Sequence, residues 1–200
     1  MSKIHFRKTK EPATIMPMEN IRLSWDLFVL VFFSVVIAYS FIVGRNQTIK
    51  IIIASYMAIL TADGLGNLFE KYILPTAPTL QGANGVQALV LLKVFVYVLV
   101  IVLLAIRGGF RVDILPENSA VTRILANLSF GFLNAGLMVS TLLVYLTGGS
   151  FVMGTVQAGL HTNLYSESEF IKTIIDHYDI WFSIPAVALV LVSFFQPSEE

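Results

Sequence analysis

Residues 86–106 read VQALVLLKVFVYVLVIVLLAI and carry a single charge, at Lys93. A helix needs roughly 20 apolar residues to cross the ~30 Å hydrocarbon core of a bilayer. Three further runs have a similar length and character: Leu23–Val43, Ile49–Gly66 and Ile124–Leu146. Backbone hydrogen bonds in lipid must be satisfied within the chain, so these runs are predicted to be helices. The chain is therefore expected to be all-α, a polytopic membrane helical bundle with four transmembrane helices.

The composition agrees with this fold class. Of the 200 residues, 56% are hydrophobic and only 13% are charged, whereas soluble domains carry about 25% charged residues. The formal net charge is zero, so no basic surface points to nucleic acid. The absence of cysteine excludes disulfides, thiolate metal sites and cysteine nucleophiles. The partner that the composition predicts is the lipid bilayer.

The chain divides into three parts. Residues 1–22 form a basic tail that is predicted to be disordered, and residues 23–147 form the four-helix transmembrane domain. Within this domain a short turn at Gly44-Arg45 predicts an antiparallel hairpin of the first two helices. The stretch Lys71–Gly85, with two prolines and two glycines, is predicted to be a loop.

Residues 148–200 are predicted to add an amphipathic helix and a short apolar helix. In the first, apolar side chains recur at helical spacing opposite charged ones: Phe170, Ile171, Ile174, Ile175 and Tyr178 against Glu169, Lys172, Asp176 and Asp179. Such a helix lies in the membrane interface or packs on the protein's own loops. The second, Ile180–Phe195, would span about 24 Å. It is predicted to be a fifth crossing, with a re-entrant or interface-buried helix as the alternative.

Two rows of small or polar residues predict where helices pack. The second apolar run carries a small residue at every fourth position, at Ala54, Ala58, Ala62 and Gly66. The fourth run carries Asn127, Gly131 and Ala135 at the same spacing, with Asn134 beside them. Small side chains let helix backbones approach closely in lipid, where apolar burial does not drive association. The two rows are therefore predicted to pack against each other.

Three charged residues stand out within the helices. Antiparallel crossing places Asp26, Asp63 and Lys93 toward the same side of the membrane. A lysine inside the hydrocarbon core is costly unless it reaches the interface or finds a carboxylate. Asp63 is the first candidate partner and Asp26 the second. This cluster is interpreted either as a structural ion pair or as an ion- or proton-handling site.

No sequence pattern predicts a catalytic, cofactor or metal site. His5, His161 and His177 are far apart in the sequence and do not share ligand spacing. The glycines near positions 64–66 and 82–85 lack the lysine and the hydroxyl residue that a phosphate-binding loop requires. The chain is therefore predicted not to be an enzyme.

Several short motifs occur in an order that resembles a known family. An aspartate opens the first helix, a Gly-Arg turn follows it, and an arginine and then a glycine mark the fourth helix: Trp25-Asp26, Gly44-Arg45, Thr122-Arg123-Ile124-Leu125 and Phe130-Gly131-Phe132. Over roughly residues 24–147 this order is similar to that of the colicin V production protein (CvpA) family of bacterial inner-membrane proteins. The chain departs from the family in three places. Asn46-Gln47 follows the arginine of the first turn, where the family usually has Gly-Phe, and Asn127 or Ser129 replaces a glycine that the family often has before Phe130. The long C-terminal segment is also atypical of the family.

The resemblance implies a multi-pass protein of the bacterial cytoplasmic membrane. It further implies a role in toxin (colicin V) production or export, or in envelope homeostasis, without a catalytic reaction. The first functional hypothesis is accordingly a non-enzymatic scaffold or accessory factor, with a second copy of the chain or export and envelope membrane proteins as partners. The second hypothesis is a small transporter or channel subunit that uses Lys93 with Asp63 and Asp26.

The cysteine-free chain allows a direct test of the helix order. Single cysteines placed at Gln47 and Leu115 are expected to react with a membrane-impermeant maleimide from the same side of the membrane, because two crossings separate them. Labelling of intact and opened vesicles measures this. Reaction from opposite sides would contradict the four-helix order.

Overall fold

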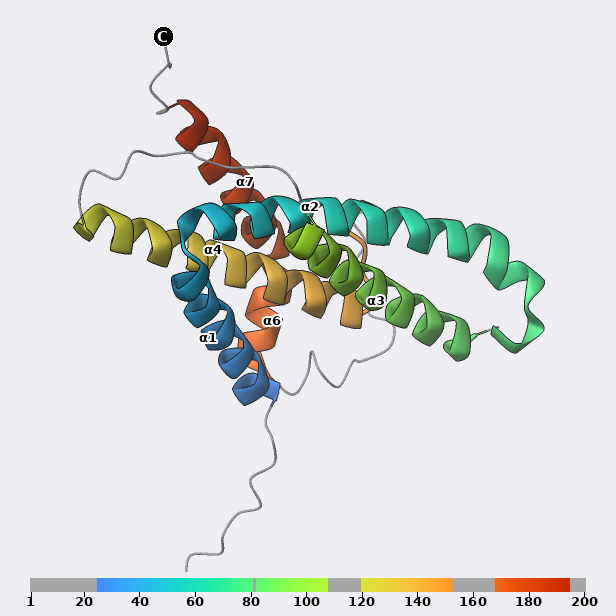
Figure 1. The fold of residues 1–200 in the computed structure, drawn as a ribbon. Helices are drawn as coiled ribbons and strands as arrows, with labels where there is room; N and C mark the ends of the chain where they lie inside the picture. The colour runs from blue at the N-terminus through green and yellow to red at the C-terminus, as the bar shows by residue number, and fades with distance from the viewer. Residues whose placement is uncertain (1–24, 81, 108–119, 153–167, 195–200) are drawn as a thin grey trace, which may run out of the picture.

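The computed structural model describes residues 25–80, 82–107, 120–152 and 168–194. Its elements are helices: α1 Trp25–Val43, α2 Arg45–Leu68, α3 Ala83–Arg107, α4 Ala120–Leu146, α6 Glu169–Asp176 and α7 Tyr178–Phe194. The described part of the chain contains no strand, and the all-α prediction is confirmed (Figure 1). The tail predicted for residues 1–22 lies outside the described residues.

Four helical segments are long and apolar enough to cross a membrane. They are Trp25–Val43, Arg45–Thr76, Ala83–Arg107 and Val121–Leu146, and each contains or closely overlaps one of the predicted apolar runs. These helices are consistent with a multi-pass membrane protein. The predicted fifth segment forms α7, which passes the same test only together with α6, across a bend of 56°. Both the broken span and the re-entrant arrangement therefore remain compatible with α6 and α7.

The segment after α2 is more helical than the sequence predicts. Helical turns continue through Phe69–Ile73 and Leu74–Thr76, and another turn covers Pro78–Leu80. The prediction of a loop from Lys71 is therefore wrong for this part. Pro75 lies at the start of its turn, where a helical residue needs no N–H donor, so the proline does not interrupt the helix. The α2–α3 pair consequently extends well beyond the rest of the bundle (Figure 1).

α4 is the central helix of the bundle. It contacts α1, α2, α3, α6 and α7, and 67% of its most apolar window is buried, against 17% for α1. A core cluster joins it to α2 and α3 through side chains such as Ile59, Tyr97 and Leu137. α1, α6 and α7 cover other faces of α4. In Figure 1, α4 runs beneath α2, and α1 slopes away below it.

The predicted row of small residues on α2 is buried, but one part of its predicted pairing is wrong. Ala54, Ala58, Ala62 and Gly66 are all inaccessible to solvent. α2 packs on α3 more than on α4, and a side chain at Gly66 would collide with Lys93 of α3. Gly131 of α4 faces Ser40 of α1 instead of α2. Residues four positions apart differ by about 40° around a helix, so a row at this spacing gradually turns around the helix axis. Because α4 has five neighbouring helices, the row of Asn127, Gly131 and Ala135 does not face α2 alone.

Gly44 alone separates α1 from α2. Its φ of +82° is readily accessible only to glycine, and it lets the chain fold back at once. Thr48 reinforces the turn by donating its hydroxyl to the Gly44 carbonyl at 3.0 Å. The two helices join directly, as the predicted hairpin requires, but they diverge from the turn because α1 packs mainly against α4 (Figure 1).

α6 uses its apolar face to pack on the protein. Ile171, Ile174 and Ile175 are buried against Val29 of α1 and against Val139 and Leu143 of α4. Ser168 caps the helix by accepting a hydrogen bond from the Ile171 N–H at 3.0 Å. α6 therefore packs on its own chain, as the second interpretation has it, but on two helices instead of on loops.

α7 is held against α4 by a contact between a tryptophan and a glycine. The Trp181 ring lies so close to Gly136 that an added Cβ would stand 2.1 Å from a ring carbon. Phe33 and Phe132 pack against the same ring. Tyr56 of α2 additionally donates its hydroxyl to the Phe182 carbonyl. Trp181, which in a fifth crossing would belong to the membrane interface, thus anchors α7 to the bundle.

This contact predicts a large difference between two glycines. Gly136→Ala is expected to destabilise the protein by about 1–3 kcal/mol, because the new methyl group overpacks the Trp181 contact. Gly64→Ala is the matched control, since nothing lies within 4 Å of a Cβ there, and it should stabilise α2 by roughly 0.5–1 kcal/mol. Thermal unfolding in detergent measures both. Equal melting temperatures for the two variants would contradict the proposed role of Gly136.

Candidate functional site

A buried ion pair joins α2 to α3. Lys93 Nζ lies 3.0 Å from Asp63 Oδ1, and the two side chains are 5% and 0% exposed. Asp63 Oδ1 has no hydrogen-bond partner among the described residues, so its contact with Lys93 is ionic. Lys93 is ten residues into α3, about 15 Å along the helix from its first residue. The structure thus brings together two of the three charged residues that the sequence singled out.

The same pair binds the backbone that follows α4. Lys93 Nζ donates to the Gly149 carbonyl at 3.2 Å. The backbone N–H groups of Phe151 and Val152 donate to Asp63 Oδ2 at 2.9 and 3.1 Å. Hydrogen bonds to charged groups are roughly twice as strong as neutral ones. The cation and the anion therefore each hold one part of this segment against α2 and α3.

The turn that ends α4 positions the backbone that contacts Lys93 and Asp63. The Gly149 N–H donates to the Val144 carbonyl and the Gly148 N–H to the Tyr145 carbonyl, at 2.8 and 2.9 Å. These two bonds, with Gly148 at a φ of +81°, form the Schellman motif that often terminates helices. The turn leaves the Gly149 carbonyl directed at Lys93. No pattern in the sequence assigned Gly148 and Gly149 to this site.

Gly66 and Tyr145 accommodate the lysine side chain. A Cβ at Gly66 would stand 2.6 Å from Lys93 Cε, so the absence of a side chain lets the lysine stem cross the surface of α2. The ammonium group lies 5.6 Å from the centre of the Tyr145 ring, within the range of a cation–π interaction. The Tyr145 hydroxyl donates to the Ile59 carbonyl of α2 at 3.2 Å. Gly66 therefore leaves the space that the Lys93 side chain occupies on its way to Asp63.

Asp26 does not join this pair, which corrects the predicted three-residue cluster. Its carboxylate accepts a hydrogen bond from the Ser168 hydroxyl, immediately before α6. The physical reason is the course of α1, which packs mainly on α4 and also contacts α6. Asp26 consequently belongs to the contact between α1 and α6.

The polar residues of α4 lie in different surroundings. Asn134 is almost fully buried, and neither atom of its amide group has a hydrogen-bond partner among the described residues. The same holds for the hydroxyls of Ser55 and Tyr97. Ala135 is fully buried. Asn127 lies nearer the helix start and lines a small polar pocket. The row predicted on this helix is thus divided among several contacts.

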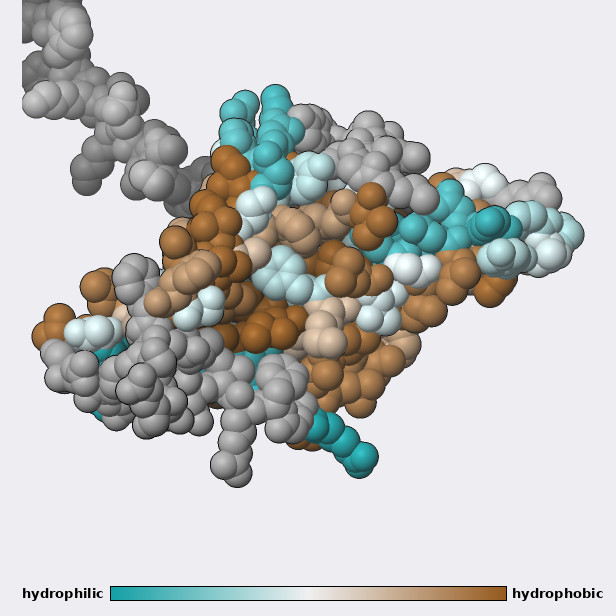
Figure 2. All heavy atoms as spheres, turned by 90° about the horizontal axis from the view of Figure 1, so that it is seen from above, coloured by the Kyte–Doolittle hydropathy of each residue, from teal (hydrophilic) through white to brown (hydrophobic). Residues whose placement is uncertain are grey.

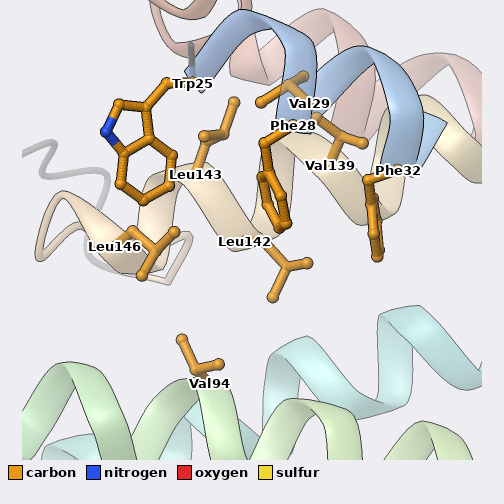
Figure 3. A pocket seen from close by; sticks show the side chains of 9 residues that line it. All are labelled: Trp25, Phe28, Val29, Phe32, Val94, Val139, Leu142, Leu143 and Leu146. Atoms are coloured by element: carbon orange, nitrogen blue, oxygen red, sulfur yellow. The ribbon is translucent and has the colours of Figure 1, made fainter. Parts of the chain in front are cut away.

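An apolar crevice of about 200 Å³ opens between α1, α3 and α4. Figure 3 shows Trp25, Phe28 and Phe32 along its α1 side, with Val94 reaching toward it from α3. The remaining lining residues are Val29, Val139, Leu142, Leu143 and Leu146. None of these side chains carries a group that could act as an acid, a base or a nucleophile. The crevice offers contact surface to apolar molecules but no chemistry.

The fold and the buried pair define a class: an all-α bundle with membrane-length helices and an internally paired charge in its core. In the described ranges no three His, Asp or Glu side chains come together as metal ligands. No known protein family, curated protein or solved structure matches the chain. The resemblance to the CvpA family therefore stays a prediction.

The geometry of the pair predicts coupled effects of substitution. Lys93→Met or Asp63→Asn alone is expected to lower the free energy of unfolding by about 3–5 kcal/mol, because each leaves the other charge of the pair buried without its partner. The double substitution should cost less than the sum, because no lone charge remains and the amide oxygen of the new asparagine can still accept the Phe151 and Val152 N–H bonds. Thermal unfolding in detergent measures the coupling.

Lys71→Met is the control for the loss of a lysine, because Lys71 is exposed beyond α2. It should leave the melting temperature nearly unchanged. Strictly additive effects of Lys93→Met and Asp63→Asn would show that the pair is not coupled.

Proposed function

We propose that the chain is a multi-pass integral membrane protein that acts as a non-enzymatic scaffold or accessory subunit. One observation carries the proposal: both charges of the Asp63–Lys93 pair are committed to partners inside the bundle. Lys93 contacts a carboxylate and a carbonyl, while Asp63 also accepts two backbone hydrogen bonds. Groups used in this way hold helices together, whereas a group that binds a passing ion must exchange its partners.

Exposed apolar surface supports the membrane location. α1 and α3 expose large apolar side chains such as Leu30, Ile42, Leu91 and Ile106, and Figure 2 shows apolar residues over much of the visible surface. A patch of this extent requires lipid or protein to cover it. Within a bilayer both are available, so the exposed faces of α1 and α3 serve as contact surfaces for acyl chains or for partner helices.

The resemblance to the CvpA family suggests the setting of this role. On that basis the protein resides in the bacterial cytoplasmic membrane and supports toxin (colicin V) production or export, or envelope homeostasis. Its partners are then a second copy of the chain or other membrane proteins of those systems. The central position of α4 and the exposed face of α1 fit a subunit that binds laterally within the membrane.

A small transporter or channel subunit is the second candidate function. The observation that favours it is the group of buried polar atoms without partners among the described residues, at Ser55, Tyr97 and Asn134. Such atoms are costly in an apolar core and usually hydrogen-bond to buried water. A file of water along these residues toward Lys93 would provide a path for protons.

Reconstitution separates the two functions. Purified protein in liposomes with a trapped pH-sensitive dye should show no more proton flux than empty liposomes, and Lys93→Met should leave this unchanged while lowering thermal stability. The double variant Asp63→Asn with Lys93→Met is the control that retains a more stable fold. A flux that wild-type protein supports and that the double variant abolishes would overturn the scaffold function in favour of the transporter.

A further inference from the structure

Three hydroxyl groups from three helices lie together in the core. Ser55 of α2, Tyr97 of α3 and Thr141 of α4 are each 0% exposed. The side chains of Ser55 and Thr141 both lie beside the Tyr97 hydroxyl. Along their own helices, Ser55 is eight residues from Asp63 and Tyr97 is four residues from Lys93. These hydroxyls therefore form a second buried polar cluster, separate from the ion pair.

The hydrogen bonds of this hydroxyl cluster are incomplete. Thr141 donates its hydroxyl proton to the Leu137 carbonyl at 2.7 Å, so toward its neighbours it can only accept. The hydroxyls of Ser55 and Tyr97 lie close enough to interact electrostatically, yet neither has an aligned hydrogen-bond partner among the described residues. Two protons without an acceptor are thus buried beside one oxygen that can still accept. Buried polar atoms of this kind are normally bonded to protein or to ordered water.

One water molecule satisfies the whole cluster. It accepts the protons of Tyr97 and Ser55 and donates one of its own to Thr141. These are about three hydrogen bonds, the number that a buried water typically makes. Neutral hydroxyls do not compensate the charge of a buried metal cation or anion, so the chemistry of the cluster favours a small neutral ligand that both donates and accepts.

The cluster is bounded along the bundle in both directions. Toward the ion pair, the Tyr145 ring packs edge-on against the Tyr97 ring, with the ring centres 5.9 Å apart. Away from the pair, buried apolar residues follow on the three helices: Ile52, Ile101 and Leu137. Asn134 lies seven residues before Thr141, about 10 Å along α4, so its unpaired amide is a separate feature.

We propose that the core holds one enclosed water molecule between Ser55, Tyr97 and Thr141. This water joins α2, α3 and α4 at a second point, in addition to the ion pair, and completes the hydrogen bonds that the side chains do not make with each other. A water bounded in both directions does not extend as a file to Lys93 and carries no protons. The inference agrees with the scaffold function but goes beyond it and does not depend on it.

A crystal structure of the full chain, at a resolution that shows ordered water, tests the proposal. One density peak is expected within hydrogen-bond distance of all three hydroxyl oxygens. Direct hydrogen bonds from Tyr97 to Ser55 or Thr141, with no peak between them, would overturn the proposal. A continuous row of peaks from the cluster to Lys93 would also overturn it, because the water would then not be enclosed.

Two variants test whether the hydroxyls hold the water. Tyr97→Phe keeps the ring but removes one partner, and it should lower the melting temperature by about 2–4 °C, the effect of one buried hydrogen bond in a chain of this length. The double variant Ser55→Ala with Tyr97→Phe removes both donors and should empty the site. An undiminished density peak in the double variant would refute the role of these hydroxyls.

Tyr56→Phe is the matched control for the loss of a tyrosine hydroxyl. Tyr56 already donates to the Phe182 carbonyl, so its replacement should leave the water peak in place even where it lowers the melting temperature. The liposome experiment tests the scaffold function separately. Absence of both proton flux and the water peak refutes this inference alone, whereas proton flux with an enclosed water peak refutes the scaffold function alone.

Discussion

The contact between Lys93 and Asp63 is the interaction on which the rest of the bundle depends. A lysine about 15 Å into a membrane-length helix cannot remain charged there without compensation. The carboxylate on α2 supplies it, and the backbone beyond α4 completes the coordination of both charges. Three helices are thereby joined at one point, and Gly66 and Gly148 have the conformations and the lack of side chain that this junction requires.

Around that junction the remaining helices are organised by α4. α2 and α3 cover one side of it, while α1, α6 and α7 cover others. Each contact of α4 has a different basis: the hydrogen bond from Lys93 to the Gly149 carbonyl just beyond α4 toward α3, Gly131 against Ser40 toward α1, and Gly136 against Trp181 toward α7. Close backbone approach and shaped packing replace the hydrophobic effect, which cannot drive helix association in lipid.

The two concentrations of charge lie toward opposite ends of α2 and differ in kind. At the Asp63 end, opposite charges are paired and buried, so their field is largely cancelled within the protein. At the Arg45 end, the described pocket brings positive groups together beside exposed apolar surface. The first arrangement stabilises the bundle.

The sequence by itself determined that the chain is helical and where the four long helices run, and it gave Asp63 as the first candidate partner of Lys93. Run length, measured against bilayer thickness, and the cost of a lone lysine were sufficient for those conclusions. Only the tertiary structure decided that Asp26 turns to Ser168, that Gly131 faces α1, that Trp181 lies on Gly136, and that the backbone of Gly149 and Phe151 completes the ion pair. Periodicity specifies which face of a helix a residue occupies, whereas the neighbour on that face depends on how the helices cross. In a bundle whose central helix touches five others, that choice depends on packing between residues far apart in the sequence.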